Sequence, residues 1–466
     1  MPHLIPLNRS ERAYAALEGV AGSVSQVYEM TFERALDPAL VRSCVRALVS
    51  AYPRTRTRLA VGVFSTSLEV LDDTDPLIEP LFDEVWRVVQ GVAANDERLH
   101  EYRNALLAEP FSLGRSLPVR FRFADHPTRP TLFMIVHHLV CDGRGMIQMI
   151  DALLGALAGK PIEPVAIDVP FMRAALWPRG LMARFRAALI DWRRMRAQKA
   201  AARGVSLIDP LAPLSAFTAP RVLRYTPKLS VKKLVAAAKA QDTSLNALTL
   251  AAVTLVLARR AGAAATVGTR EVAVRISVDV RPYFDPPRPN AFGNFVASFM
   301  VRSTRFSDAA ALLADVGAQL KEGVRRFKDH ERGFGLLLDE IGTWIGLRLY
   351  SLAARRLKTR GKLAPMSAHY STVGSVDFFA RHDAGLCEFS GYAPNTGLFV
   401  TSVSFRDELR MGIIYPAGGL TPSEVNAVAV ELEGALAELS QLEPAAGPAT
   451  VSDMAPRPAA AVALSA

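Results

Sequence analysis

The feature that most constrains this chain is a short apolar run that ends in two histidines. Residues Thr131 to Val136 (TLFMIV) form a run of strand length, which is typical of a strand buried on both faces. The segment HHLVCDG (residues 137–143) follows directly, and apolar residues at helical spacing begin at Met146. Because the end of a strand holds its backbone rigid while side chains reach open space, we expect a functional site at this strand–turn–helix unit.

The length of 466 residues is enough for two or three domains, or for two large lobes. Hydrophobic residues make up 50% and charged residues 21%, which excludes general disorder and collagen-like or coiled-coil repeats. We predict a mixed α/β (α+β) fold in four parts. These are an N-terminal lobe (1–160), a basic crossover linker (161–220), a C-terminal lobe (221–442) and an Ala/Pro-rich disordered tail (443–466).

Local patterns predict several individual elements of the two lobes. Asp37-Pro38 is typical of a helix N-cap followed by proline at the first helical position. Val119 to Phe123 (VRFRF) alternates strictly, which predicts a half-buried strand. The other predicted elements are a strand over Ser25 to Phe32, a helix over Met146 to Ala158, a strand near Arg221–Tyr225, helices opening at Ser230 and Ser244, a strand over Val272 to Val280, and two strands between Leu398 and Tyr415 that meet at Asp407-Glu408.

The two histidines are candidates for chemistry. Consecutive residues on a strand point to opposite faces, so His137 and His138 do not easily bind one metal ion. We expect one to enter the core and the other to face a cleft, where a neutral imidazole is a natural general base. Asp142, beyond a sharp turn marked by Gly143 and Gly145, is expected to hold the loop by an ion pair. The alternative is that both histidines are core residues and Asp142-Gly143 is a plain turn.

Other sites are not indicated by the sequence. It contains no GxSxG, GxxxxGK[ST] or HExxH, so a serine-hydrolase elbow, a P-loop and a zincin site are not expected. Three widely separated cysteines (Cys44, Cys141 and Cys387) do not predict a disulfide framework or a thiolate zinc site. We therefore do not predict a metal site.

HHLVCDG resembles the HHxxxDG motif of a large acyltransferase superfamily. The superfamily includes chloramphenicol acetyltransferase, the condensation domains of nonribosomal peptide synthetases, plant acyl-CoA-dependent transferases, and bacterial wax ester synthase/diacylglycerol acyltransferases. Further segments resemble the superfamily in the expected order, up to about residue 440: AYPRTRTRL (51–59), EPFSLGRSLPVRFRF (109–123), LSVKKLVAAAKAQDTSLNALTLAAV (229–253), ISVDVRPYF (276–284), AFGNFV (291–296) and HYSTVGSVDFF (369–379).

The resemblance implies two chloramphenicol-acetyltransferase-like lobes with a tunnel between them. Acyl donor and acceptor would enter from opposite ends, and His138, which matches the second histidine, would be the general base. His137 and Gly143 would have structural roles. Ser371 and Thr372 would be the oxyanion donors, with a threonine where the superfamily often has asparagine.

The same resemblance implies that Asp142 forms an ion pair with Arg281, which fixes the loop to the second lobe. It also implies that Asn294 holds the site residues in place without contacting the substrate. The alternatives are that Arg281 caps a strand end at the surface and that Gly293-Asn294 is a simple turn.

We therefore expect an acyltransferase that moves an acyl group from acyl-CoA or an acyl carrier protein to a hydroxyl of a hydrophobic acceptor. The wax ester synthase/diacylglycerol acyltransferase branch is the nearest resemblance. A free-standing condensation-type protein that forms an amide or ester is a second hypothesis, and a non-catalytic relative that binds a lipid or a carrier protein is a third. No cofactor is expected beyond the acyl-CoA or phosphopantetheine-bound co-substrate.

The formal net charge of +10 is concentrated in two segments. Residues 173–203 contain nine basic residues and one acid, and residues 348–362 contain six basic residues and no acid. In the first segment Trp177, Leu181, Phe185, Leu189 and Trp192 recur at helical spacing among arginines, a pattern that is typical of a helix at the surface of an anionic membrane. The alternative is a helix that packs this stripe on the protein. No nucleic-acid-binding module accompanies the charge, so nucleic acid is not an expected partner.

The expected location is cytoplasmic, with possible membrane association. The first residues, MPHLIPLNRSERAYAALEG, show no apolar signal-peptide core. The longest apolar stretch, Leu245 to Ala258, has 14 residues, too few to cross a hydrocarbon core of about 30 Å.

Overall fold

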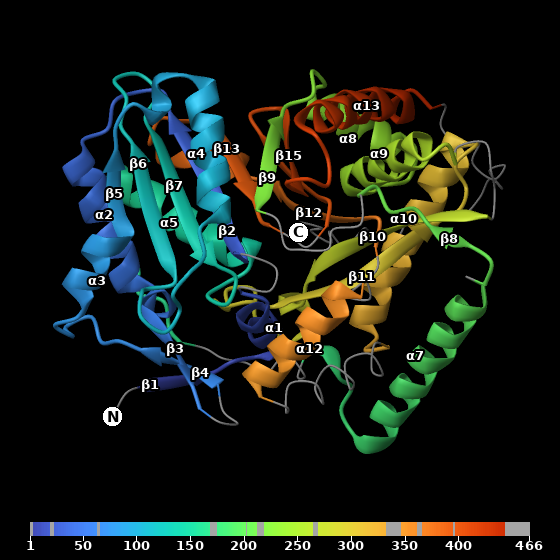
Figure 1. Cartoon of the computed structure of the whole chain (residues 1–466), viewed down its shortest axis with the longest axis horizontal. Helices are drawn as coiled ribbons and strands as arrows, with labels where there is room; N and C mark the ends of the chain where they lie inside the picture. The colour runs from blue at the N-terminus through green and yellow to red at the C-terminus, as the bar shows by residue number, and fades with distance from the viewer. Residues whose placement is uncertain are drawn as a thin grey trace, which may run out of the picture.

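The computed structural model describes residues 3–18, 23–62, 66–167, 175–201, 203–211, 219–263, 269–331, 346–360, 366–394 and 397–442. Two lobes stand side by side, the first in blue and cyan and the second in green to red (Figure 1). The predicted α/β fold is confirmed: the described residues form a five-stranded, a seven-stranded and a three-stranded sheet, each covered or flanked by helices. The predicted tail, 443–466, lies outside the described residues.

The N-terminal lobe is built on the five-stranded sheet, in the order β13-β2-β7-β6-β5. A small sheet of order β1-β4-β3 lies below it (Figure 1). The elements of this lobe are β1 (His3–Pro6), α1 (Arg9–Leu17), β2 (Ser25–Phe32), α2 (Pro38–Ala51), η1 (Pro53–Arg56), β3 (Thr57–Val61), β4 (Thr66–Val70), α3 (Ile78–Val85), β5 (Trp86–Val89), η2 (Val92–Ala94), α4 (Asp96–Ala108), β6 (Val119–Ala124), β7 (Thr131–His137) and α5 (Gly143–Leu157).

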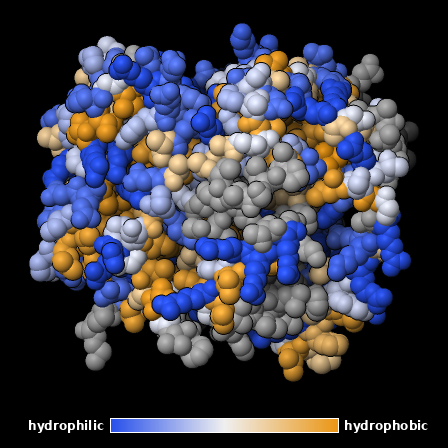
Figure 2. All heavy atoms as spheres, viewed as in Figure 1, coloured by the Kyte–Doolittle hydropathy of each residue, from blue (hydrophilic) through white to orange (hydrophobic). Residues whose placement is uncertain are grey.

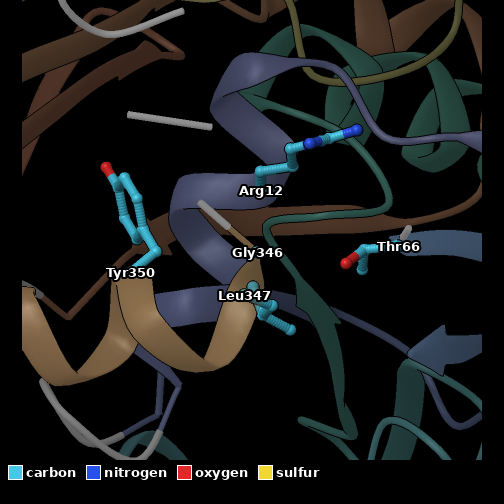
Figure 3. Close-up of a pocket in the computed structure, with 5 residues that line it drawn as sticks. All are labelled: Arg12, Thr66, Gly346, Leu347 and Tyr350. Atoms are coloured by element: carbon cyan, nitrogen blue, oxygen red, sulfur yellow. The ribbon is translucent and has the colours of Figure 1, made fainter. Parts of the chain in front are cut away.

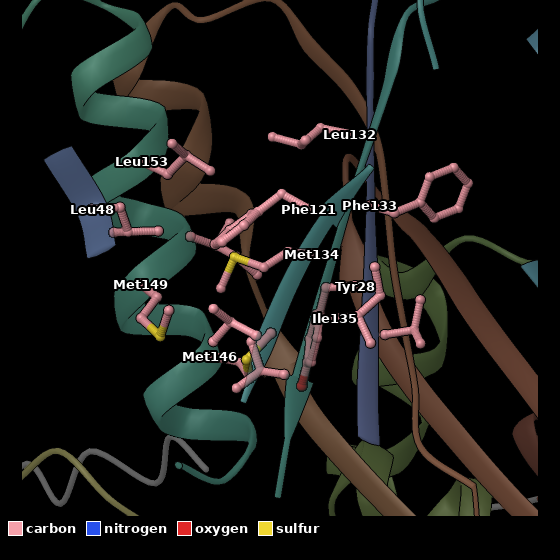
Figure 4. Close-up of a cluster of buried hydrophobic side chains, with 14 of the residues drawn as sticks. Tyr28, Leu48, Phe121, Leu132, Phe133, Met134, Ile135, Met146, Met149 and Leu153 are labelled. Carbon is pink, nitrogen blue, oxygen red and sulfur yellow. The ribbon is translucent and has the colours of Figure 1, made fainter. Parts of the chain in front are cut away.

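Strand β7 is buried along its whole length because both of its faces are covered. Leu132 and Met134 point toward α5, while Phe133 and Ile135 point to the opposite side of the sheet (Figure 4). Burying such side chains contributes about 1.5–3 kcal/mol each, so the strand that ends at the two histidines is among the most firmly held parts of the lobe.

The C-terminal lobe is built on the seven-stranded sheet, in the order β11-β10-β12-β14-β15-β9, with β8 paired to β10. Its helices α8, α9 and α13 cluster together beside this sheet (Figure 1). The remaining elements are α7 (Leu181–Ala201), β8 (Ser206–Leu207), β9 (Pro220–Tyr225), α8 (Val231–Ala240), α9 (Leu245–Arg260), β10 (Arg270–Asp279), η3 (Arg281–Tyr283), β11 (Val296–Ser303), α10 (Ala309–Lys328), α12 (Leu347–Thr359), β12 (Ala368–Ser375), η4 (Asp377–His382), β13 (Leu386–Tyr392), β14 (Phe399–Phe405), β15 (Glu408–Pro416) and α13 (Pro422–Ser440).

Helix α9 contains the longest apolar stretch of the sequence and forms the centre of the second core. Its two buried threonines are satisfied within the helix, since Thr249 donates to the Leu245 carbonyl at 2.9 Å and Thr254 to the Leu250 carbonyl at 2.8 Å. Within the described residues, no helix combines the length and the apolar character that crossing a membrane requires.

The two lobes share a strand. β13 follows η4 late in the sequence, yet it pairs with β2 in the N-terminal sheet, with Phe389 opposite Met30. Chain beyond residue 221 therefore also completes the sheet of the first lobe. Apolar residues of β14 and β15 that face this lobe, such as Phe399 and Ile414, belong to the same core as β7.

Several local predictions are confirmed at the level of single residues. β2 has the predicted bounds, and Asp37 caps α2 by accepting from the Ala39 amide at 2.9 Å. Ser230 and Ser244 are the N-caps of α8 and α9. The two strands predicted between Leu398 and Tyr415 are β14 and β15.

Two local predictions differ from the structure. The helix predicted from Met146 begins at Gly143, because Asp142 acts as its N-cap and the two glycines form its first turn. VRFRF is not half-buried: Arg122 is buried because its guanidinium donates to the carbonyls of Val85 at 2.6 Å and Phe121 at 3.0 Å. Alternation of apolar and polar residues indicates which side chains share a face of the strand. It does not indicate whether the face with the arginines packs against another element.

Candidate active site

The turn after β7 is the centre of the candidate site. β7 ends at His137, residues 138–140 form a turn closed by the Val140 amide donating to the His137 carbonyl at 2.9 Å, and α5 begins at Gly143. The Asp142 carboxylate accepts from the Gly145 amide at 3.0 Å and so caps the helix. The strand and the helix thus fix both ends of the turn.

All four carbonyls of residues 138–141 accept a hydrogen bond from a side chain. The Asn294 amide donates to His138 O at 2.7 Å, and Arg54 donates to Leu139 O at 3.1 Å and to Val140 O at 2.9 Å. The Gln26 amide donates to Cys141 O at 2.7 Å. Because these donors come from three separate elements, the turn is held in one conformation before any substrate binds.

His137 faces the core, where it is fully buried. Its Nδ1 accepts from the Leu139 amide at 3.1 Å, so its Nε2 carries the proton and donates to Glu18 at 3.2 Å. Burial alone would raise the pKa of Glu18, but the hydrogen bond and electrostatic attraction of the His137 ring and two backbone amides hold that pKa below its usual value. The contacts of His137 thus tie the turn to the residue that follows α1.

His138 is only partly buried, and its ring lies against Tyr14 of α1. The two rings stack with centroids 4.4 Å apart and planes 12° apart. The Nδ1 atom of His138 is buried and makes no hydrogen bond among the described residues. Burial, with a smaller contribution from His137, lowers the pKa of His138 to about 3, although Asp142 and the Cys141 backbone oppose this shift. The imidazole is therefore neutral at neutral pH.

The lowered pKa of His138 predicts that kcat/KM changes little with pH in mildly acidic solution. The deprotonated form of His138 persists below its usual range, so kcat/KM should change less than about twofold between about pH 5 and pH 7.5. An imidazole with the usual pKa of about 6.5 would lose about 30-fold at pH 5. Initial rates with a non-ionising acceptor measure the profile, and circular dichroism at each pH checks that the protein stays folded. An acidic limb centred near pH 6.5 would contradict the prediction.

Asp142 and Arg281 form the expected ion pair, and both side chains are almost completely buried. The pair is bidentate, with nitrogen–oxygen distances of 2.8 and 3.1 Å. Arg281 also donates to the Ala291 carbonyl at 2.7 Å, and Asp142 also accepts from the Phe295 amide at 2.8 Å. Burial alone would lower the pKa of Arg281, but Asp142 and Asp279 raise it. The alternative of a surface strand cap is thus excluded for Arg281.

Asn294 lies between the two lobes. Its side chain donates to the His138 carbonyl, and its own carbonyl accepts from Asn8 at 2.8 Å. The preceding residue, Gly293, has φ of +153° and accepts from the Asp142 amide at 3.2 Å. Gly293-Asn294 is therefore an interlobe contact and more than a simple turn.

Gly145 shows why this turn excludes a side chain. A Cβ added there would lie 2.6 Å from the Cβ of Cys141 and 3.3 Å from a ring carbon of Phe292. We expect Gly145→Ala to destabilise the protein by about 1–3 kcal/mol, because the crowded atoms belong to buried residues. The matched control is Gly434→Ala in α13, where nothing lies within 4 Å; it should stabilise the helix by up to about 1 kcal/mol. Urea unfolding measures both, and equal effects would refute the explanation.

The two oxyanion candidates lie on adjacent residues of β12 but differ in their contacts. The Thr372 hydroxyl donates to the Ser402 carbonyl at 3.1 Å and accepts from the Gly374 amide at 3.1 Å, so its proton is already engaged. Ser371 shares a face of the strand with Val373, whose methyl group would lie 3.3 Å from a Cβ at Gly143. The face of β12 that carries Ser371 therefore lies against the start of α5.

Sequence reasoning missed three features around His138. Tyr14 and the buried Arg54–Glu11 ion pair, from two separate elements, support the turn. His369 stacks on Phe399 at 4.3 Å, and its Nε2 lies 3.0 Å from the Ser277 hydroxyl. Burial lowers the pKa of His369 to about 3, with Arg275 and His138 as further causes. Arg54 and His369 do lie in two of the segments that resemble the superfamily, AYPRTRTRL and HYSTVGSVDFF, but no sequence signal pointed to Tyr14 or Glu11.

Within the described residues, no group of three or more His, Cys, Asp or Glu side chains is placed to hold a metal ion. The arrangement offers instead one neutral imidazole on a rigid turn, where the two lobes meet. Such a group can accept a proton from a bound hydroxyl or amine.

No family model and no curated protein matches this chain. Solved structures do match it. The first condensation domain of the calcium-dependent antibiotic synthetase, in complex with a substrate analogue, is similar with a TM-score of 0.68 at 16% identity, over 95% of this chain and 98% of that chain. The trichothecene 15-O-acetyltransferase from Fusarium sporotrichioides is similar with a TM-score of 0.66 at 12% identity, over 92% and 94% of the two chains.

A double mutant of the starter condensation domain of rhizomide synthetase, in complex with C8-CoA and Leu-SNAC, is similar with a TM-score of 0.64 at 14% identity. It covers 95% of each chain. The chain therefore has the two-lobed fold of condensation domains and of this acetyltransferase, which confirms the fold expected from the resemblance.

Proposed function

We propose that this protein is an acyltransferase that moves an acyl group from a thioester to a hydroxyl group, with His138 as the general base. The observation that carries the proposal is a neutral imidazole on a turn whose four carbonyls are all hydrogen-bonded, at the junction of the two lobes. An imidazole held in this way needs no reorganisation to accept a proton.

The reaction would proceed by direct attack. The acceptor oxygen forms a bond to the thioester carbonyl carbon while its proton passes to His138. The carbonyl becomes a tetrahedral oxyanion, and Ser371 is the preferred donor to it, since the proton of Thr372 is engaged elsewhere. The carbon–sulfur bond then breaks, and the imidazolium returns the proton to the leaving thiolate. Negative charge beside His138 in this step favours its protonated form, which offsets the effect of burial on its pKa.

The proposed donor is acyl-CoA or an acyl group on a phosphopantetheine arm, used as a co-substrate with no separate cofactor. The solved structures that share the fold include one in complex with C8-CoA and Leu-SNAC and a 15-O-acetyltransferase, which supports a thioester donor and a hydroxyl acceptor. The proposed acceptor is a hydrophobic alcohol, as in the wax ester synthase/diacylglycerol acyltransferase branch, and the proposed location is cytoplasmic.

Release of free thiol from acyl-CoA tests the proposal. Purified protein is offered a series of acyl-CoA chain lengths with a series of alcohols, and products are identified by mass spectrometry. We expect thiol release that depends on the alcohol, together with the matching ester. Folded protein that releases no thiol from any donor in the presence of any acceptor would overturn the proposal and favour a non-catalytic binding role.

A second candidate function is condensation of a carrier-bound acyl group with an amine. The observation that favours it is the similarity to two condensation domains over 95% of this chain. The two candidates differ in their substrates, so the same assay with acyl carrier protein and amine acceptors separates them. Amide formation from the carrier-bound donor, with no ester from acyl-CoA, would select condensation.

A further inference from the structure

Helix α7 begins with an apolar end that lies outside the protein. Its first six residues, 181–186, are all exposed, and Leu181, Met182 and Phe185 are 81%, 79% and 66% exposed. These are the three most exposed large apolar side chains in the described part of the chain. Figure 1 places this end of α7 at the lower side of the molecule, and Figure 2 shows apolar side chains there in the same view. The alternative that this stripe packs on the protein is therefore wrong for Leu181 and Phe185, whereas it holds for Trp177, which packs against the second core.

The charge around this end is positive. Arg184 and Arg186 are exposed between the apolar residues. The single acid of α7, Asp191, is buried and lies 2.5 Å from Arg326, so it does not offset the arginines at the surface. Apolar side chains interleaved with arginines are typical of helices that lie in the interface of an anionic bilayer.

Helix α12 repeats this composition at the same side of the molecule. Leu349 is 60% exposed and Leu352 is also exposed, and the helix carries no acid. Seven of the fifteen exposed large apolar side chains lie on α7 and α12, which have 21 and 13 residues. This concentration distinguishes the two helices from the rest of the described surface, where such residues are scattered.

A groove of ≈ 460 Å³ runs along α12. It is lined by Val61 of β3, Leu347, Arg348, Ser351, Leu352 and Arg355. Leu347 also lines a second, smaller cavity, where α12 faces α1 and β4; its other lining residues are Arg12, Thr66, Gly346 and Tyr350 (Figure 3). Helix α1 contacts both α12 and the site, since Ser351 donates to the Ala16 carbonyl of α1 at 2.9 Å and Tyr14 of α1 stacks on His138.

We propose that the exposed ends of α7 and α12 form a docking face for an anionic lipid bilayer, and that the groove along α12 takes up the apolar substrate from it. The docking face consists of Leu181, Met182, Phe185, Leu349 and Leu352 with the arginines between them. The use of the groove rests on the proposed function, whereas binding of the face to a bilayer does not.

Vesicle sedimentation tests the docking face without any substrate. Wild-type protein is mixed with vesicles of phosphatidylcholine alone or of equimolar phosphatidylcholine and phosphatidylglycerol. We expect binding to the anionic vesicles that weakens with salt. Leu181→Ser/Met182→Ser/Phe185→Ser should lower the partition coefficient at least about tenfold. Arg348→Ala/Arg355→Ala should lower it by about fivefold per arginine for anionic vesicles only.

The control is Leu40→Ser/Leu77→Ser/Val430→Ser, which removes exposed apolar side chains from other parts of the surface and should leave binding unchanged.

Turnover of soluble acyl-CoA and a soluble alcohol should be equal in the wild type and the α7 triple variant. Wild type that stays in solution with both kinds of vesicle, or a control that lowers binding equally, overturns the docking face. If the α7 variant loses only turnover of a carrier-bound donor, the face binds a protein and the proposal fails. Vesicle binding without turnover would instead refute the proposed function alone.

Discussion

Replacing His138 by alanine is expected to lower kcat for acyl transfer by about 10²–10⁴-fold, the usual contribution of a positioned general base. Its imidazole is neutral, stacked on Tyr14, and carried on a turn that does not depend on the ring for its own hydrogen bonds. The substitution should therefore remove the base while leaving the fold and the binding of the donor unchanged. Thiol release under saturating donor and acceptor measures kcat, and the donor concentration dependence measures KM.

The matched control is His382→Ala. His382 is also largely buried, but it lies 2.8 Å from Asp151 in the C-terminal half of α5, at the opposite end of the helix from the turn that carries His138. It should change thermal stability and leave kcat within about twofold of the wild type. Wild-type turnover in the His138 variant would show that another group takes the proton, and His369, whose pKa is also lowered to about 3, would be the next residue to replace.

Replacing Arg281 by alanine is expected to cost about 3–5 kcal/mol of unfolding free energy, because it leaves the Asp142 carboxylate buried without its partner. Of its hydrogen bonds to described residues, the Asp142 carboxylate would keep only those from the Gly145 and Phe295 amides. The loss also removes the hydrogen bonds that Arg281 donates to the Ala291 and Gly293 carbonyls, so the contact between the lobes should loosen. Urea unfolding followed by tryptophan fluorescence and circular dichroism measures the change.

An exposed pair of the same geometry is the control for Arg281. Arg259 and Glu438 form two bonds of 2.8 Å at the surface, so Arg259→Ala should cost only about 0–1 kcal/mol. If both arginine variants lost the same free energy, burial of the Asp142–Arg281 pair would not be the reason for its effect. A loss below about 1 kcal/mol for Arg281→Ala would refute the structural role inferred for this pair.

The local parts of this site could be predicted because their causes lie within a few residues. Asp37, Ser230 and Ser244 cap helices through amides two or three positions ahead, and the apolar run of β7 indicated burial on both faces. The motif at 137–143 placed His138 and Asp142 on one turn for the same reason. The start of α5 was missed only because the glycines of its first turn resemble those of a loop.

The surroundings of His138 were decided by contacts between residues more than 80 positions apart. Tyr14, Arg54 and Asn294 reach the turn from an N-terminal helix, a 3₁₀ turn and the second lobe. No periodicity in the sequence relates such residues, since each contact depends on how the elements pack. The hydrogen bond of Thr372 also depends on packing, because its hydroxyl donates to the carbonyl of Ser402 on the neighbouring strand β14.

By itself the sequence determined where several strands, helices and caps form and which turn carries the histidines, because those depend on alternation, helical spacing and side chains that bond nearby amides. Only the tertiary structure decided that β13 completes the first lobe, that His138 stacks on Tyr14 with a lowered pKa, and that the apolar end of α7 faces outward. Burial and long-range pairing are properties of the packed chain, and they set the electrostatics on which the proposed chemistry depends.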